Sequence, residues 1–97
     1  MVITFGAVLL LGAVLQVPTY NKDIAPLVAQ RCAMCHNAGL ANKNVRLDTP
    51  ELIAKNAQAL YQQAVVAKTM PLNNATQITE AERAALGRWV QGGAKLE

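Results

Sequence analysis

All the cysteine and histidine of this chain lies within five consecutive positions. Residues 32–36 read Cys-Ala-Met-Cys-His, and the rest of the 97-residue sequence contains neither residue type. Two cysteines three positions apart cannot close a useful disulfide loop. Any fold of this chain must therefore present one local cluster of two thiols and one imidazole, which indicates a ligand or an attachment site.

The spacing Cys-x-x-Cys-His predicts covalent attachment of a c-type haem. Each thiol can add to one vinyl group of the porphyrin, which gives two thioether bonds. The imidazole of the next residue is then held beneath the iron. We therefore predict haem c as the cofactor, Cys32 and Cys35 as its attachment residues, and His36 as the proximal ligand of the iron.

Three other interpretations of the motif are weaker. A structural zinc site normally has four ligands, and Cys32, Cys35 and His36 supply three. A redox-active Cys-x-x-Cys is typical of a βαβ context, and no strand-like alternation occurs in this chain. A chance arrangement in a structural helix is the third. Haem attachment is favoured because it uses all three residues at their fixed spacing.

A six-coordinate haem needs a second axial ligand, and His36 is the only histidine. Met1 is the terminus, and Met34 lies between the two cysteines, too close to the proximal side to reach over the ring. Met70, which lies 34 residues after His36, is the remaining methionine. We therefore predict Met70 as the distal iron ligand.

There are two alternatives for the sixth position: Lys68 is the ligand, or the position is open. Met70 would then be an ordinary core residue. The loop position of Met70 before Pro71 favours ligation. A thioether ligand raises the reduction potential of haem iron, and a fully coordinated iron exchanges single electrons. A sensor would need a labile sixth site, and a peroxidase would need a distal acid–base residue.

Helix signals predict an all-α fold with three to four short helices around the haem. The first helix is expected over about 23–32, with Asp23 as N-cap and Pro26 in the first turn. The second is expected from Thr49 to about Val65, and the third from a capping box of Thr79 and Glu82 to Gly92. Residues 37–48 and 68–77 are expected to be loops.

The chain divides into an apolar segment 1–19, a haem domain 20–94 and a possible tag remnant 95–97. The first 15 residues are uncharged and apolar apart from glycine and Thr4, so they are the end of a membrane helix, a signal-like segment or a packed apolar helix. About 78 residues remain, and a chain below roughly 80 residues seldom gains a comfortable stability margin from its core alone. A large apolar cofactor would supply the missing buried surface.

The charge pattern argues against nucleic acid as a partner. The net charge is +3, and the basic residues are spread without a run and without interleaved aromatics. Protein redox partners are expected instead, with docking helped by surface charge.

Three further residues are candidate cofactor contacts. Arg46 is expected to pair with a haem propionate, since arginine forms bidentate bonds with carboxylates. Pro71 is expected beside the distal ligand, and Trp89 is expected either to wall the haem pocket or to belong to the core.

From about Tyr20 to Gly93 the chain resembles a small monohaem cytochrome c with histidine and methionine ligands, carried by Cys32, Cys35, His36 and Met70-Pro71. The stretches DIAPLVAQRCAMCH, VRLDTPELI, QQAV and MPLNNATQITEAERAALGRWV are similar to the C-terminal cytochrome domain of bacterial membrane-anchored urate oxidases (urate hydroxylases).

That resemblance implies an N-terminal bundle of membrane helices before the domain, of which the apolar start of the chain would be the end. It implies that the domain carries electrons from urate oxidation towards the respiratory chain and is an electron carrier rather than an enzyme by itself. It also implies a place on the periplasmic side of the bacterial inner membrane. A free-standing small cytochrome c is the alternative.

Overall fold

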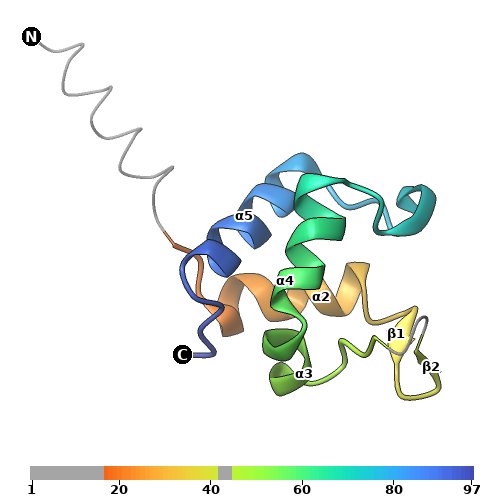
Figure 1. Cartoon of the computed structure of the whole chain (residues 1–97), viewed down its shortest axis with the longest axis horizontal. Helices are drawn as coiled ribbons and strands as arrows, with labels where there is room; N and C mark the ends of the chain where they lie inside the picture. Colours follow the sequence, from red (N-terminus) through yellow and green to blue (C-terminus); the bar gives the residue numbers. More distant parts are fainter. Residues whose placement is uncertain (1–16, 42–44) are drawn as a thin grey trace, which may run out of the picture.

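The computed structural model describes residues 17–41 and 45–97, and these residues are mostly helical (Figure 1). The expected all-α class is confirmed at this level. The predictions for residues 1–16 lie outside the described residues. In chain order the elements are η1 (Tyr20–Ile24), α2 (Ala25–Arg31), β1 (His36–Asn37), β2 (Leu40–Ala41), α3 (Pro50–Lys55), α4 (Ala57–Leu60), η3 (Tyr61–Val66), η4 (Leu72–Asn74) and α5 (Glu80–Gln91).

The first helical stretch begins one turn earlier than predicted. Thr19 is the N-cap, with extended backbone, and η1 runs directly into α2. The expected N-cap Asp23 instead lies inside η1, and its carboxylate accepts a hydrogen bond of 2.9 Å from the Thr19 backbone N–H. The prediction for Asp23 is wrong because Tyr20 and Ile24 are both buried, so the apolar face starts before the acidic residue. Pro26 lies in the first turn of α2, as predicted.

The second helical stretch starts as predicted but is not continuous. The Thr49 hydroxyl accepts from the Leu52 backbone N–H at 3.2 Å, and Pro50 takes the first helical position. Asn56 then interrupts the helix, with φ −95° and ψ 15°. Its side-chain amide donates to the carbonyls of Leu52 at 2.9 Å and Arg46 at 3.2 Å, so it competes with the helical backbone. The stretch is therefore divided into α3, α4 and η3.

The last helix, α5, has the predicted boundaries. Thr79 and Glu82 form the capping box, with reciprocal hydrogen bonds of 3.1 Å and 2.9 Å. Gly92 is the C-cap. Leu86, Trp89 and Val90 from the expected apolar stripe are buried, so this helix supplies one side of the core.

The core lies where η1 and α2 cross α5. The largest fully buried side chains are Ile24 and Val28 from the first stretch and Leu86 and Trp89 from α5. The ring of Tyr20 packs against Trp89 with centroids 5.7 Å apart. The α5 helix packs also against η3, and there an added Cβ at Gly87 would lie 3.1 Å from a methyl carbon of Val65. A residue without a side chain at position 87 allows this close approach.

The predicted loop 37–48 contains a short strand pair that the sequence did not indicate. Residues of β1 and β2 pair antiparallel, His36 with Ala41 and Asn37 with Leu40. The Asn37 side chain accepts from the Gly39 N–H at 2.9 Å, which closes the turn between the strands. The pair is two residues long and leaves the class unchanged. It lies at the end of the molecule opposite the C-terminus (Figure 1).

The C-terminal residues contact the core. The indole N–H of Trp89 donates to the Lys95 carbonyl at 2.8 Å, and Leu96 packs against the buried cluster. Lys95 and Leu96 therefore contact the core. Within the described ranges 17–41 and 45–97, no helix combines the length and the hydropathy needed to cross a membrane.

The capping box gives a stability prediction. Thr79→Ala should lower the free energy of unfolding by about 1 kcal/mol, since the Glu82 N–H loses its acceptor at the start of α5. Thr79→Ser keeps the hydroxyl and should stay within about 0.5 kcal/mol of the wild type. Urea unfolding followed by circular dichroism measures both. Equal stability of the alanine variant and the wild type would show that the capping box does not stabilise α5.

Candidate haem attachment site

The motif begins where α2 ends, and its backbone continues as one more turn. The Cys32 carbonyl accepts from the N–H groups of Cys35 at 3.2 Å and His36 at 3.1 Å. Residues three and four apart in such a turn are neighbours. The fold therefore places both Cys35 and His36 one turn beyond Cys32, next to it.

The two cysteines lie in different surroundings. Both carry thiols rather than a disulfide, and Cys32 is 9% exposed whereas Cys35 is exposed. Burial raises the pKa of the Cys32 thiol to about 11, although the nearby charge of Arg83 acts in the opposite direction. Cys32 therefore faces the interior and Cys35 the surface.

The imidazole of His36 is oriented by one hydrogen bond. Its Nδ1 lies 2.8 Å from the Val45 carbonyl oxygen, which can only accept, so Nδ1–H is the donor. When Nδ1 carries the proton of a neutral ring, Nε2 has a lone pair for a metal. Metal-binding histidines usually have such a second hydrogen bond on the other ring nitrogen. The His36 carbonyl also accepts from the Leu47 N–H at 2.7 Å, which ties the histidine backbone to the same segment.

Asn37 supports the turn, and the sequence analysis did not identify it. Its side-chain amide donates to the carbonyls of Ala33 at 2.7 Å and Met34 at 3.0 Å. These carbonyls belong to the residues between the cysteines and would otherwise lack partners at the end of the helix. The signal that was available is an asparagine directly after the motif, since asparagine side chains often bond to nearby backbone.

The predicted distal ligand has a fixed backbone. The Met70 N–H donates to the Gln63 carbonyl at 3.0 Å, and the Met70 carbonyl accepts from Nη1 of Arg83 at 2.9 Å. The Met70 side chain is half-buried, and so is the adjacent Pro71. Arg83 is a second residue that the sequence analysis did not identify.

The segment after Met70 is tied to the residue that precedes the motif. The Thr76 hydroxyl donates to the Arg31 carbonyl at 2.7 Å, and Nη1 of Arg31 donates to the Thr76 carbonyl. Arg31 also forms an ion pair of 3.2 Å with Glu82 at the start of α5. In Figure 1, η4 and the β1–β2 pair lie at the same end of the long axis. The fold thus brings the Met70 segment and the Cys-x-x-Cys-His turn to one end of the molecule.

Arg46 lies between Val45 and Leu47, the two residues bonded to His36, whereas Trp89 lies in the core. Arg46 forms a bidentate pair with Asp48, with distances of 3.0 Å and 3.1 Å, and this hydrogen-bonded pair lowers the pKa of Asp48. Trp89 is 1% exposed in the core, at the crossing of η1 and α5. Their roles at a haem stay predictions.

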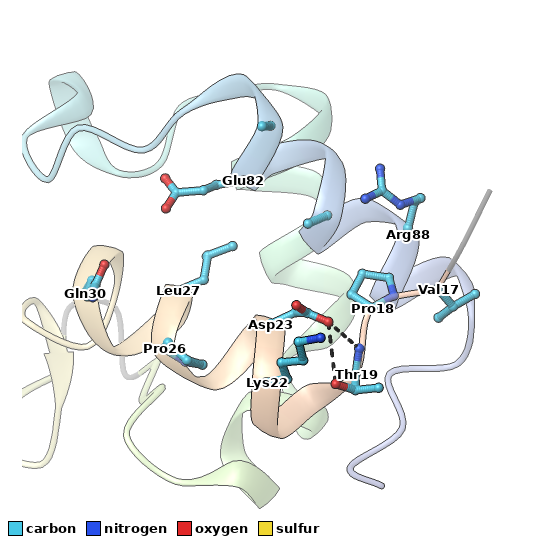
Figure 2. A pocket seen from close by; sticks show the side chains of 12 residues that line it. Val17, Pro18, Thr19, Lys22, Asp23, Pro26, Leu27, Gln30, Glu82 and Arg88 are labelled. Carbon is cyan, nitrogen blue, oxygen red and sulfur yellow. Dashed lines mark hydrogen bonds between the residues drawn. The ribbon is translucent and has the colours of Figure 1, made fainter. Parts of the chain in front are cut away.

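Two cavities of the described residues adjoin α2, and Ala33 of the motif lines the smaller one. The larger, about 540 Å³, lies between η1–α2 and α5 and is shown in Figure 2. Its lining mixes apolar Leu27 and Pro26 with charged Lys22, Glu82 and Arg88. The second, about 370 Å³, lies between α2 and the start of α3. The attachment residues line neither of them.

Direct metal binding by the motif alone has no support in this geometry. Within residues 17–41 and 45–97, no three side chains of histidine, cysteine, aspartate or glutamate are grouped so that they could hold a metal ion. Cys32, Cys35 and His36 thus do not form the convergent set that a zinc site requires.

Comparison of the chain with protein-family models, with curated proteins and with solved structures finds no match.

The buried thiol gives a pH prediction for protein whose cysteines are unmodified. The pKa of Cys32 is raised from 9.0 to about 11, so the folded state favours the neutral thiol. The resulting stability is present below pH 9 and is lost as the pH rises towards 11. The free energy of unfolding should fall by roughly 2–3 kcal/mol over this pH range.

Urea unfolding between pH 8 and pH 11 measures this effect, with Cys32→Ser as the control. The serine variant should lack the part of the pH dependence that belongs to the thiol. The same pH dependence in wild type and Cys32→Ser would contradict the buried position of Cys32.

Proposed function

We propose that residues 20–94 form a haem c electron-transfer domain with histidine and methionine ligands to the iron. The observation that carries the proposal is the bond between His36 Nδ1 and the Val45 carbonyl, directly after the cysteine pair. This bond leaves Nε2 of His36 as the atom that could bind a metal. His36 is the one histidine of the sequence and belongs to the motif that suits haem attachment.

The residues present fit this cofactor. Cys32 and Cys35 are both thiols, one facing inward and one exposed, so a planar group bonded to both would lie along the edge of the core. Exposed apolar side chains are found on the motif and near Met70, namely Met34, Val66 and Leu72. These exposed side chains are available to contact a bound cofactor.

Each residue has a separate task in the proposed site. Cys32 and Cys35 hold the cofactor covalently, and His36 binds the iron through Nε2 while Val45 keeps the imidazole plane in place. Met70 supplies a soft sulfur ligand that favours the reduced iron and fills the sixth position. When bound, the haem supplies a one-electron couple. The helices then wrap the cofactor as in a small cytochrome c.

Arg46, Pro71 and Trp89 complete the proposed cofactor contacts. Arg46 would have to exchange Asp48 for a propionate, which is feasible because the pair is partly exposed to solvent. Pro71 limits the backbone directly after the ligand.

Protein redox partners and a membrane context belong to the same proposal. Electrons would pass from a donor, a urate-oxidising membrane domain according to the resemblance, to a respiratory acceptor. The domain would lie on the periplasmic side of the inner membrane and be anchored through the segment 1–19. The net charge of +3 suits an acidic docking surface on the partner.

One observation favours a second candidate, a haem sensor with a labile sixth ligand. Four non-glycine residues around Met70 have positive φ: Lys68, Asn73, Asn74 and Gln77. Such conformations cost free energy and are common at functional sites that move. A loop of this kind could release Met70 for an external ligand.

Attachment of the cofactor is tested by expression with a cytochrome c maturation system. We expect haem that resists acid–acetone extraction and a mass increase of one haem per chain. Cys32→Ala/Cys35→Ala should bind haem only loosely, because both thioethers are gone. A wild-type chain that matures without covalent haem would refute the proposal.

Replacement of the distal ligand separates the two candidates. Met70→Ala should lower the reduction potential by on the order of 100 mV, within the roughly 0.8 V that axial ligands span. It should also let carbon monoxide bind rapidly to the reduced protein. Potentiometry and stopped-flow absorption measure both. An unchanged potential would show that Met70 is not the ligand, and rapid carbon monoxide binding by the wild type would favour the sensor.

A further inference from the structure

Arg83 is a buried charged residue that the proposed site does not yet use. It is 6% exposed, and it is the one charged residue in the buried set of the described residues. Burying a guanidinium is costly unless its N–H groups find acceptors. Its contacts should therefore indicate what it stabilises.

Those contacts are carbonyl oxygens of the segment that leads to Met70. Nη1 of Arg83 donates to the carbonyl of Ala64, in η3, and to the carbonyl of Met70 at 2.9 Å. Carbonyls near a helix end lack intrahelical partners, and a cation there is favourable. Nη1 of Arg83, a side-chain nitrogen on α5, thus connects η3 with Met70.

A second nitrogen of the side chain, Nε, leads to the same segment. Nε lies 3.5 Å from a carboxylate oxygen of Glu80 but has no hydrogen-bond partner. The second oxygen of Glu80 pairs with Nζ of Lys68 at 2.8 Å. Glu80 is well exposed, so this part of the network is weak. The buried bonds of Nη1 carry the interaction.

Met70 is consequently held at both backbone polar groups. Gln63 accepts from its N–H at 3.0 Å and Arg83 donates to its carbonyl at 2.9 Å. These two bonds fix where the side chain starts, although the next residues include several with positive φ. The sulfur can then reach only the positions that its own three side-chain torsions allow.

We infer that Arg83 is the positioning residue of the distal ligand: by fixing the Met70 carbonyl against η3, it sets how firmly the Met70 sulfur stays on the iron. The inference rests on the proposed function. Arg83 itself does not touch the iron. Lysine could keep the charge but carries one nitrogen on a flexible stem, so it holds the two carbonyls less well.

The test uses the haem-loaded full chain and compares Arg83→Gln and Arg83→Lys with Arg88→Gln. Arg88 lies on the same helix, at the cavity of Figure 2, so its variant is a matched control for loss of charge. The readouts are the rate of carbon monoxide binding to the reduced protein and the near-infrared band of methionine-ligated ferric haem. Both report the sulfur–iron bond directly, and covalent haem stays on the chain in every variant.

Arg83→Gln should bind carbon monoxide about tenfold to a hundredfold faster than the wild type and lose part of the near-infrared band. The binding rate of Arg83→Lys should lie between those of Arg83→Gln and the wild type. The rate of Arg88→Gln should match the wild type. Wild-type behaviour of both Arg83 variants, in a protein whose Met70 is shown to ligate, overturns this inference alone. A wild-type chain without covalent haem overturns the proposed function and the inference together.

A second measurement does not depend on a variant that folds. In the haem-loaded wild type, the Arg83 guanidinium protons should exchange with solvent at least about tenfold more slowly than those of free arginine. Nuclear magnetic resonance measures this rate. Exchange as fast as in free arginine would show that the guanidinium does not hold the Met70 carbonyl, and would overturn the inference.

Discussion

The packing of η1 and α2 against α5 is the constraint on which the rest of the structure depends. Ile24 and Val28 meet Leu86 and Trp89 there, and these four are the largest fully buried side chains. The crossing joins the two ends of the described chain, because the first helical stretch starts at Tyr20 and α5 ends at Gln91. The other elements lie between these ends in the sequence, and η3 also packs against α5.

Polar side chains extend this rigidity from the core to the candidate site. Arg31, at the end of α2, bonds to Glu82 and to the Thr76 carbonyl, and so fixes the start of the cysteine turn against α5 and the distal segment. Arg83, one residue after Glu82, performs the same task for Met70. The segments that carry both proposed axial ligands are therefore held against α5. A redox site benefits from such an arrangement, since a ligand set that moves little costs little reorganisation when the electron arrives.

Features that depend on neighbouring residues were predictable from the sequence. The caps at Thr49 and Thr79 and the attachment motif all lie within a few positions, and their chemistry acts locally. Asn56 breaks a predicted helix partly through the Arg46 carbonyl, ten residues away, which no local pattern reveals. The burial of Arg83 was likewise unpredictable, because its acceptors come from η3 and from the loop that follows η3. The sequence thus predicted the capping residues and the attachment motif. The tertiary contacts of Asn56 and Arg83 could be seen only in the folded structure.

The missing side chain at Gly87 has a consequence for how this chain can vary. Position 87 lies one helical turn after Arg83, and its face of α5 rests on Val65 in η3. A larger residue there would push the two helices apart at the same interface across which the guanidinium reaches its acceptors. If Met70 binds a haem iron as proposed, a substitution at position 87, which contacts no ligand, would act on that bond through the Arg83 contact. The residue types that suit this helix crossing would then depend on the cofactor as well as on the packing.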